Sequence, residues 1–343
     1  MSLHGVNFVG YELGVFTKHE EEDYARIKSW GLNLVRLPIA WQYLEPEPNV
    51  YNSSYLDYVE RDLSWARKYG IYIILDFHQW HWSPHFNFEG RACGLPVWAV
   101  SKYPNTMEGM GRAITDFWLG KGPNGSVASE ENPSLQNRFV HMWRLVASRF
   151  KNDPCVAAYD LFNEPYRSDN LYEGGLTPFQ TAEYLYPLYY TLIGAIREVD
   201  ARHVIIYEPV GGWDVPSVRM LLYGNIALSF HCYDYHSTYD GNTTKLEDNF
   251  EKKFLLSPSP NPISDWDLPI YLGEFGTCLE YPNSSSWLVD MLTIFSSHQL
   301  LYWTFWAYFR CDDSYSLLHY NGTEKVEFVS PLKAATSKTS TNS

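Results

Sequence analysis

The sequence predicts an α/β protein of the (β/α)8 or TIM barrel class, built as a single domain with one long loop after the third strand. Two observations support this prediction. Short apolar segments alternate with segments of helical period over most of the 343 residues, and the apolar runs are continuous. Continuous apolar strands are typical of parallel sheets covered by helices on both faces. The 45% hydrophobic content supplies one large core, which excludes a disordered chain or a small disulfide-stapled module.

Runs rich in apolar or β-branched residues predict eight strands. These are residues 6–9, 34–37, 72–77, 157–162, 204–207, 226–230, 270–272 and 301–305. Helical periodicity predicts helices at residues 20–30, 55–69, 135–150, 179–199, 215–222, 246–255 and 287–298. Beyond the eighth strand only residues 329–335 have a helical pattern, so we expect a short or irregular final helix. Eight consecutive β/α units are the number that closes a barrel.

The connection after the third strand, residues 79–133, is far longer than the others. It is rich in Gly, Pro, Trp and His and has no strong period. Loops of this length are usually functional, so we expect it to fold over one end of the barrel. We assign residues 1–333 to the barrel domain. Residues 334–343 are rich in Ser, Thr and Lys, and we expect a tail or the start of a linker there.

The charge balance restricts the class of partner. The chain has 26 Lys and Arg against 40 Asp and Glu, a formal charge of −14. This charge disfavours nucleic acid and anionic membranes and suits a neutral substrate. No apolar stretch approaches the roughly 18–20 residues of a membrane span, so we expect no membrane insertion. The oligomeric state is not predicted.

Three features bear on the compartment. The N-terminus lacks a secretory signal, yet Asn-x-Ser/Thr sequons favour an extracellular protein whose signal is absent; a cytoplasmic location is the alternative. The sequons begin at Asn52, Asn124, Asn242, Asn283 and Asn321. Five scattered cysteines include no C-x-x-C pair, which argues against a zinc ribbon. In an exported protein, Cys278 and Cys311 are the pair to test for a disulfide.

Polar residues gather where the predicted strands end, the end at which barrels carry their active sites. They are Arg36 at strand two, Asp76 and His78 at strand three, Asn163 and Glu164 at strand four, Glu208 at strand five, His231 and Tyr233 at strand six, Glu274 at strand seven and Trp306 at strand eight.

Two of these residues, Glu164 and Glu274, suggest a specific chemistry. Hydrolysis of a glycosidic bond needs one protonated carboxyl to release the leaving oxygen and one carboxylate to attack the anomeric carbon. The simpler alternative is that each glutamate forms an ion pair at the barrel rim, with Arg36 as an available partner. A second alternative is a metal site formed by His78, His81 and His85 with Asp76. We expect no metal and no cofactor.

Six motifs then resemble, in chain order, those of glycoside hydrolase family 5, the cellulase family. The resemblance covers residues 5–306. The motifs are Val35-Arg36-Leu37-Pro38, Asp76-Phe77-His78-Gln79, Asn163-Glu164-Pro165, His231-Cys232-Tyr233, Gly273-Glu274-Phe275-Gly276 and Trp303-Thr304-Phe305-Trp306.

The resemblance implies a role for each matching residue. Glu164 resembles the acid/base and Glu274 the nucleophile of a double displacement. Arg36 and Tyr233 are expected to hold Glu274 ionised, whereas Glu164, with no obvious cation nearby, is expected to have a raised pKa. The remaining matches are Asn163 for the sugar 2-hydroxyl, His78 and His231 as hydrogen-bonding histidines, and Trp306 as a platform under the sugar, with Trp303 as its alternative.

Further substrate contacts are expected from the aromatic surplus, which is 17% of the chain. Flat apolar rings stack on the C–H faces of sugars. The residues assigned to such contacts are Trp41, Trp80, Trp82 and Trp213, and Glu208 is assigned as a further substrate-binding residue.

These expectations combine into a retaining β-glycoside hydrolase acting on β-1,4-linked polysaccharide, as an endoglucanase or a β-mannanase. Two alternatives lie within the same family. The long loop could close the cleft, as in an exo-acting β-mannosidase or β-glucosidase, or could form a lipid-accepting groove, as in an endoglycoceramidase-like enzyme. An alternative of another class is a non-catalytic carbohydrate-binding barrel, which predicts that one glutamate is missing. Both are present.

Overall fold

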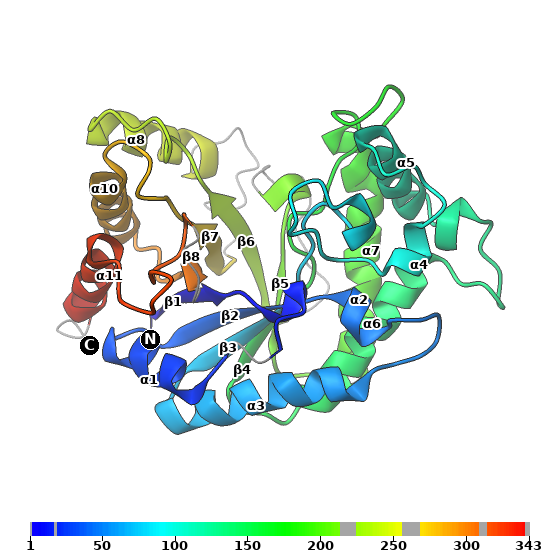
Figure 1. Cartoon of the computed structure of the whole chain (residues 1–343), viewed down its shortest axis with the longest axis horizontal. Coiled ribbons are helices and arrows are strands. Elements are labelled where there is room, and N and C mark those ends of the chain that lie inside the picture. The colour runs from blue at the N-terminus through cyan, green and yellow to red at the C-terminus, as the bar shows by residue number, and fades with distance from the viewer. Residues whose placement is uncertain (1, 17–18, 213–223, 256–267, 309–313, 340–343) are drawn as a thin grey trace.

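The computed structural model describes residues 2–16, 19–212, 224–255, 268–308 and 314–339. Its centre is a closed barrel of eight parallel strands that pair in chain order, with β8 closing against β1 (Figure 1). The strands are β1 Leu3–Phe8, β2 Leu34–Ile39, β3 Tyr72–Phe77, β4 Val156–Asp160, β5 Val204–Tyr207, β6 Ile226–Cys232, β7 Ile270–Phe275 and β8 Tyr302–Tyr308. The predicted barrel is confirmed.

Helices cover the outside of the barrel. In Figure 1, α1 and α3 lie below it, α5, α6 and α7 to the right, and α8, α10 and α11 to the left. The α-helices are α1 Glu21–Ser29, α2 Trp41–Leu44, α3 Ser53–Tyr69, α4 Val97–Val100, α5 Met107–Trp118, α6 Leu135–Phe150, α7 Pro178–Arg197, α8 Thr243–Phe250, α10 Ser284–Ser297 and α11 Val326–Thr339. Within the described residues, no helix has the length and apolar character that crossing a membrane requires.

Strands β6, β7 and β8 extend further than the apolar runs predicted. His231, Glu274 and Trp306 therefore lie inside strands instead of after them. The reason is that neighbouring strands continue to pair past the apolar segment, as in the register that places His231 opposite Glu274. Because the strands were predicted from apolar runs, each prediction stopped at the first polar residue. In this barrel those polar side chains point into the interior, where they form hydrogen bonds and ion pairs with one another.

The core has two parts separated by the strands. A large cluster fills the space between the barrel and its helices. A smaller cluster plugs the barrel interior and consists of Leu34, Ile74, Ala158, Ile206, Ala227 and Tyr271. Side chains of a strand alternate between the two sides, so Leu34 and Arg36 both face inward. The apolar plug thus forms the floor on which the polar interior rests.

The long connection after β3 contains helices, which its sequence did not predict. Helix α5 begins at its N-cap Thr106, whose hydroxyl accepts a hydrogen bond from the backbone N–H of Gly109 at 3.0 Å. Gly109 and Gly111 weaken the helical pattern of the sequence. Both glycines allow close packing, because a Cβ on Gly109 would lie 1.9 Å from the carbonyl oxygen of Pro104.

The final helix is also longer than predicted. It runs from Val326 to Thr339 and so includes residues expected to form a tail. Phe328, Val329 and Leu332 are buried in the large cluster, which explains why the helix is regular there. The predicted helix at residues 215–222 and the proposed disulfide partner Cys311 lie outside the described residues.

Candidate active site

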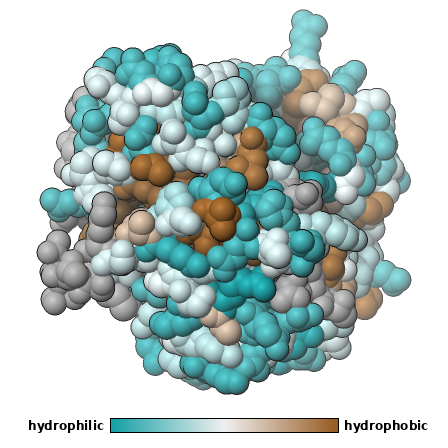
Figure 2. Space-filling model, turned by 60° about the vertical axis from the view of Figure 1, so that its left-hand side comes forward, coloured by the Kyte–Doolittle hydropathy of each residue, from teal (hydrophilic) through white to brown (hydrophobic). Residues whose placement is uncertain are grey.

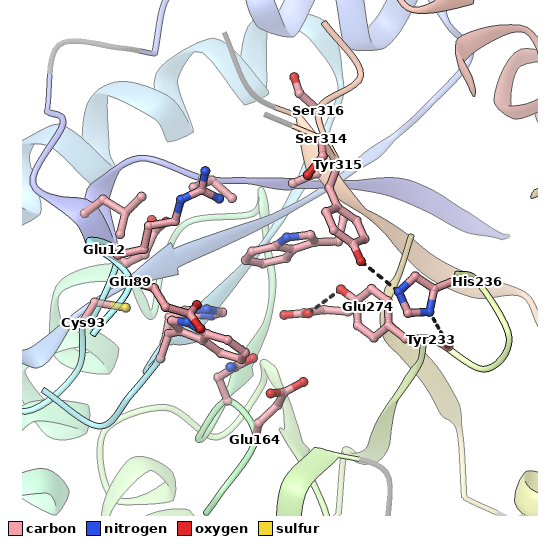
Figure 3. A pocket seen from close by; sticks show the side chains of 18 residues that line it. Glu12, Glu89, Cys93, Glu164, Tyr233, His236, Glu274, Ser314, Tyr315 and Ser316 are labelled. Carbon is pink, nitrogen blue, oxygen red and sulfur yellow. Dashed lines mark hydrogen bonds between the residues drawn. The ribbon is translucent and has the colours of Figure 1, made fainter. Parts of the chain in front are cut away.

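A cavity of about 450 Å³ opens at the carboxyl ends of the strands. Its size falls within the roughly 300–1,000 Å³ usual for small-molecule sites. Six of the strand-end residues predicted from the sequence line it, and Figure 3 shows Glu164, Tyr233 and Glu274 among them. The six are His78, Asn163, Glu164, Tyr233, Glu274 and Trp306. The motifs therefore converge on one cavity, although they are spread over more than 200 residues of chain.

Glu164 and Glu274 approach each other across this cavity. Each is only 5% exposed. One carboxylate oxygen of each, with a ring nitrogen of His231, forms a group whose atoms all lie within 4.8 Å of one another. The two carboxylates are thus close enough to act on one bond of a bound molecule.

Glu274 is held by two donors. Arg36 Nη1 lies 2.8 Å from Glu274 Oε1, and the hydroxyl of Tyr233 donates to Glu274 Oε2 at 2.9 Å. Both expected contacts are present. Because each oxygen has its own partner, the carboxylate plane has one orientation.

Arg36 also binds three other carboxylates beneath the cavity. Its guanidinium nitrogens lie 2.9 Å from Asp160, 3.1 Å from Asp76 and 3.2 Å from Glu208. Arg36 is fully buried and does not touch the cavity. Arg36 therefore holds Glu274 in place and does not contact the substrate.

Glu164 occupies a strained turn directly after β4. Its φ is +40°, in the left-handed region that non-glycine residues disfavour. Glu208 Oε2 accepts a hydrogen bond from the Glu164 N–H at 2.8 Å, and Gln79 Nε2 donates to the Glu164 carbonyl at 2.9 Å. These two side chains hold the turn. Glu208 is fully buried, so its assignment as a substrate-binding residue is wrong and it acts beneath the site.

His231 corrects the expectation that Glu164 has no cation nearby. His231 Nδ1 lies 2.7 Å from Glu164 Oε1, and Nε2 lies 3.2 Å from Glu208 Oε1. Burial opposes a charge on His231, but Glu208 and Glu274 outweigh it and raise the pKa of the imidazole. Burial raises the pKa of Glu164 despite the opposing effect of His231, and Glu274 adds to the rise. The expected rise in the pKa of Glu164 is therefore correct, but the expected absence of a nearby cation is wrong because His231 lies beside it.

Comparison with known proteins agrees with this geometry. The profile of the family described as cellulase, glycosyl hydrolase family 5, matches residues 2–310. The chain belongs to this family. An endo-glycoceramidase II from Rhodococcus sp., in a cellobiose-like isofagomine complex, has 25% sequence identity and a TM-score of 0.80 over 97% of this chain and 79% of that one.

Two curated relatives differ in name. An endoglycoceramidase of Cyanea nozakii is 26% identical over 325 residues, covering 85% of this chain and 61% of the relative. Endoglucanase C of Acetivibrio thermocellus is 28% identical over 207 residues, covering 57% of this chain and 46% of the relative. The chain therefore spans between about half and three fifths of the length of these relatives.

Two of the tryptophans expected to contact substrate line the cavity, Trp306 from a family 5 motif and Trp80 from the long connection. Trp306 lines the cavity, and its ring stacks on His78 at 5.4 Å between centroids. His78 Nδ1 lies 2.7 Å from Asp76, which orients the ring. Trp80, from the long connection, also lines the cavity.

Three other tryptophans were assigned wrongly to the cleft. Trp41 is buried against Phe139, Trp82 is fully buried within the long connection, and Trp303 packs on the outer face of β8. The strand period explains the last case, because an inward Trp306 requires Trp303, three positions earlier, to point outward. Trp213 lies outside the described residues.

The histidine metal site is not formed. His78 binds Asp76, His81 stacks on Trp80, and His85 Nε2 lies 2.7 Å from the carbonyl of Tyr103. These histidines belong to none of the ligand clusters found among the described residues. The long connection thus uses its histidines for packing and backbone contacts.

The motifs missed one side of the cavity, which Figure 3 shows with Glu12 and Glu89. Glu12 follows β1 and is buried, and its Oε2 accepts a hydrogen bond from the N–H of Gly10 at 2.9 Å. Burial raises the pKa of Glu12, against the effect of nearby His78. Applying the strand-end rule to β1 would have found Glu12, whereas Glu89 comes from a loop without a sequence signal.

We predict that Arg36→Lys lowers the free energy of unfolding by about 2–4 kcal/mol, because one ammonium cannot replace a guanidinium that contacts four buried carboxylates. Urea denaturation measures the change. The control is Arg112→Lys on α5, which alters an exposed pair with Glu108 and should cost less than about 1 kcal/mol. Equal losses in the two variants would contradict the central role of Arg36.

Proposed function

We propose that this protein hydrolyses β-glycosidic bonds with retention of anomeric configuration. The observation that carries the proposal is the approach of Glu164 and Glu274 to within 4.8 Å. Retaining enzymes hold their carboxyl groups about 5–5.5 Å apart, whereas inverting enzymes need about 6.5–9.5 Å to admit a water. The short distance favours direct attack by one carboxylate.

In the first step, an oxygen of Glu274 forms a bond to the anomeric carbon. The bond from that carbon to the leaving oxygen breaks, and the leaving oxygen takes the electron pair and a proton from Glu164. In the second step, Glu164 accepts a proton from water, whose oxygen attacks the same carbon and releases Glu274. The raised pKa of Glu164 suits the donor role, and the Arg36 and Tyr233 contacts suit the nucleophile.

The other cavity residues complete the site in this proposal. Trp306 carries the sugar on its ring face, and His78 keeps that ring in place through the observed stacking. Asn163 Oδ1 accepts a hydrogen bond from Arg36 at 2.9 Å, and the same residue lines the cavity. Its Nδ2 also donates to the carbonyl of Gln79, so the amide is held at the cavity, and we assign it to the sugar 2-hydroxyl.

For the substrate we propose a saccharide that is β-linked to a lipid. The support is the likeness to an endo-glycoceramidase over 97% of this chain, and to a curated endoglycoceramidase over 85%. The endoglucanase relative covers less of the chain, 57%. A β-1,4-polysaccharide, the first expectation from sequence, is the second candidate because of that relative.

An extracellular setting is also a proposal. Asn52, Asn242, Asn283 and Asn321 are exposed, as glycan acceptors must be. Asn124 is half-buried, and its side chain bonds to the backbone of Trp98 and Lys102. We therefore expect no glycan on Asn124.

We predict that Glu274→Ala lowers kcat/KM by roughly 10⁴-fold or more on every substrate, because it removes the attacking group. Glu164→Ala should lose most activity on phenyl glycosides and much less on dinitrophenyl glycosides, whose leaving groups need no proton. The exposed Glu108→Ala on α5 is the control. If Glu274→Ala kept a turnover near that of the wild type, the proposed mechanism would be refuted.

The pH dependence gives a second prediction. Glu164 must be protonated to donate, so kcat/KM falls as the pH rises through the raised pKa of Glu164. His231 opposes that rise in pKa, so His231→Asn should move the alkaline limb to higher pH. Profiles on a phenyl β-glycoside measure the limb. A limb at unchanged or lower pH in the variant would contradict the assignment.

The substrate is tested by a product profile. We expect detergent-dispersed lactosylceramide to release intact lactose and ceramide with a higher kcat/KM than that for carboxymethylcellulose or mannan. Faster release of oligosaccharides from a polysaccharide would favour the second candidate, and release of single sugars alone would show exo action. No hydrolysis of these substrates or of aryl β-glycosides would refute the enzymatic proposal.

A further inference from the structure

Exposed large hydrophobic side chains are unevenly distributed over the described part of the chain. Most lie in connections that leave the carboxyl ends of strands, the end that carries the cavity; Leu301 is the one that lies in a connection entering a strand. The face in Figure 2 shows small groups of hydrophobic residues on an otherwise largely hydrophilic surface. The pattern differs from the single scattered residues that need no explanation.

Four of these side chains lie at or beside two adjoining cavities, and we call them the apolar rim. They are Val15, Trp80, Phe88 and Val97, each between 38% and 46% exposed. Trp80 lines the catalytic cavity, whereas Val15 and Val97 line a second cavity of about 590 Å³. The two cavities share Leu13 and Arg91 as lining residues, so they lie next to each other.

Ring contacts connect the rim across the long connection. Trp80 stacks on His81 at 5.1 Å between centroids, and His81 lies 5.7 Å from Phe88. The three rings form one unit, yet Trp80 and Phe88 keep more than a third of their surface exposed. Apolar ring surface therefore stays exposed to water beside the catalytic cavity. This exposure is unfavourable in free energy, and binding of an apolar partner would remove it.

The segment that carries Trp80, Phe88 and Val97 has a different charge from the whole chain. Residues 79–106 contain Glu89 against Arg91 and Lys102, a net charge of +1, whereas the whole chain carries −14. Most acidic residues therefore lie in other segments. A bilayer of neutral phospholipids meets no net repulsion from the chain, whereas an anionic bilayer would be repelled by its charge of −14.

We propose that the apolar rim docks on the surface of a neutral phospholipid bilayer and brings the catalytic cavity to glycolipid headgroups. Tryptophan and phenylalanine insert readily at the boundary between headgroups and acyl chains, and the valines add apolar area. This mode needs no spanning helix. The docking proposal rests on the proposed glycolipid substrate and adds that the protein binds this substrate at a membrane surface. A polysaccharide is a poorer partner, because Val15 and Val97 offer neither hydrogen bonds nor a ring face to a sugar.

The test uses phosphatidylcholine vesicles, alone and with lactosylceramide, and the double variant Phe88→Asp/Val97→Asp. Neither residue lines the catalytic cavity. We expect partitioning onto vesicles and turnover of vesicle-embedded lactosylceramide to fall at least about tenfold, with hydrolysis of a soluble aryl β-glycoside unchanged. The latter activity shows that the variant is folded. Phe88→Ser/Val97→Ser provides a milder pair if the aspartates prevent folding.

The matched control is Val289→Asp on α10, which replaces a valine of similar exposure, 47%, outside the rim. It should leave vesicle binding unchanged. Three results would overturn the docking proposal: unchanged binding in the double variant, absence of wild-type binding to neutral vesicles, or a wild-type dimer that the double variant dissociates in sedimentation. The last result would assign the rim to a second copy of the chain.

The docking proposal and the substrate proposal fail separately. If the wild type cleaves lactosylceramide in detergent but the rim variants bind vesicles normally, only docking is refuted. If the wild type binds vesicles through the rim but cleaves no glycolipid in detergent, only the substrate is refuted. Vesicles containing phosphatidylglycerol add a check, since the acidic chain should bind them more weakly than neutral ones.

Discussion

The buried guanidinium of Arg36 is the contact on which the interior of this barrel depends. The apolar plug occupies only the lower part of the barrel, and above it Asp76, Asp160, Glu208 and Glu274 meet one cation. Four carboxylates without a cation would have to bind protons or stay hydrated, and both would alter the cavity floor. Through Glu274 the guanidinium reaches the cavity directly, and through Glu208 it reaches the turn that carries Glu164.

Much of the fold could be predicted because the apolar runs of a parallel barrel are a strong local signal. The bounds of β3 and β5 follow from those runs alone. The predictions failed where tertiary contacts override local pattern. Helix α5 contains Gly109 and Gly111, which packing requires and helical propensity disfavours, and α11 continues past Leu332 because its first turns are anchored in the core.

The site was predictable to the extent that its residues lie at strand ends. Glu164 and Glu274 could be predicted to act together, because glycoside hydrolysis needs two carboxyl groups. Their closeness follows from barrel closure, which brings the carboxyl ends of the strands together. The position of His231 between Glu164 and Glu208 could not be predicted, because no sequence pattern indicates the register shift between β6 and β7 that places His231 opposite Glu274. The predictions for Trp41, Trp82 and Trp303 were wrong for a related reason. The composition gives the number of aromatic rings, but the direction of each side chain decides whether its ring is exposed.

The left-handed turn at Glu164 has a consequence for inactivation. The side chains of Gln79 and Glu208, which follow β3 and β5, hold its carbonyl and its N–H, so the turn depends on contacts with two neighbouring β/α units. A local opening that frees either side chain lets residue 164 relax to an ordinary backbone conformation and carries its carboxyl away from Glu274. The barrel can stay folded while this happens. We therefore expect heating to break these few hydrogen bonds around residue 164 before it melts the sheet.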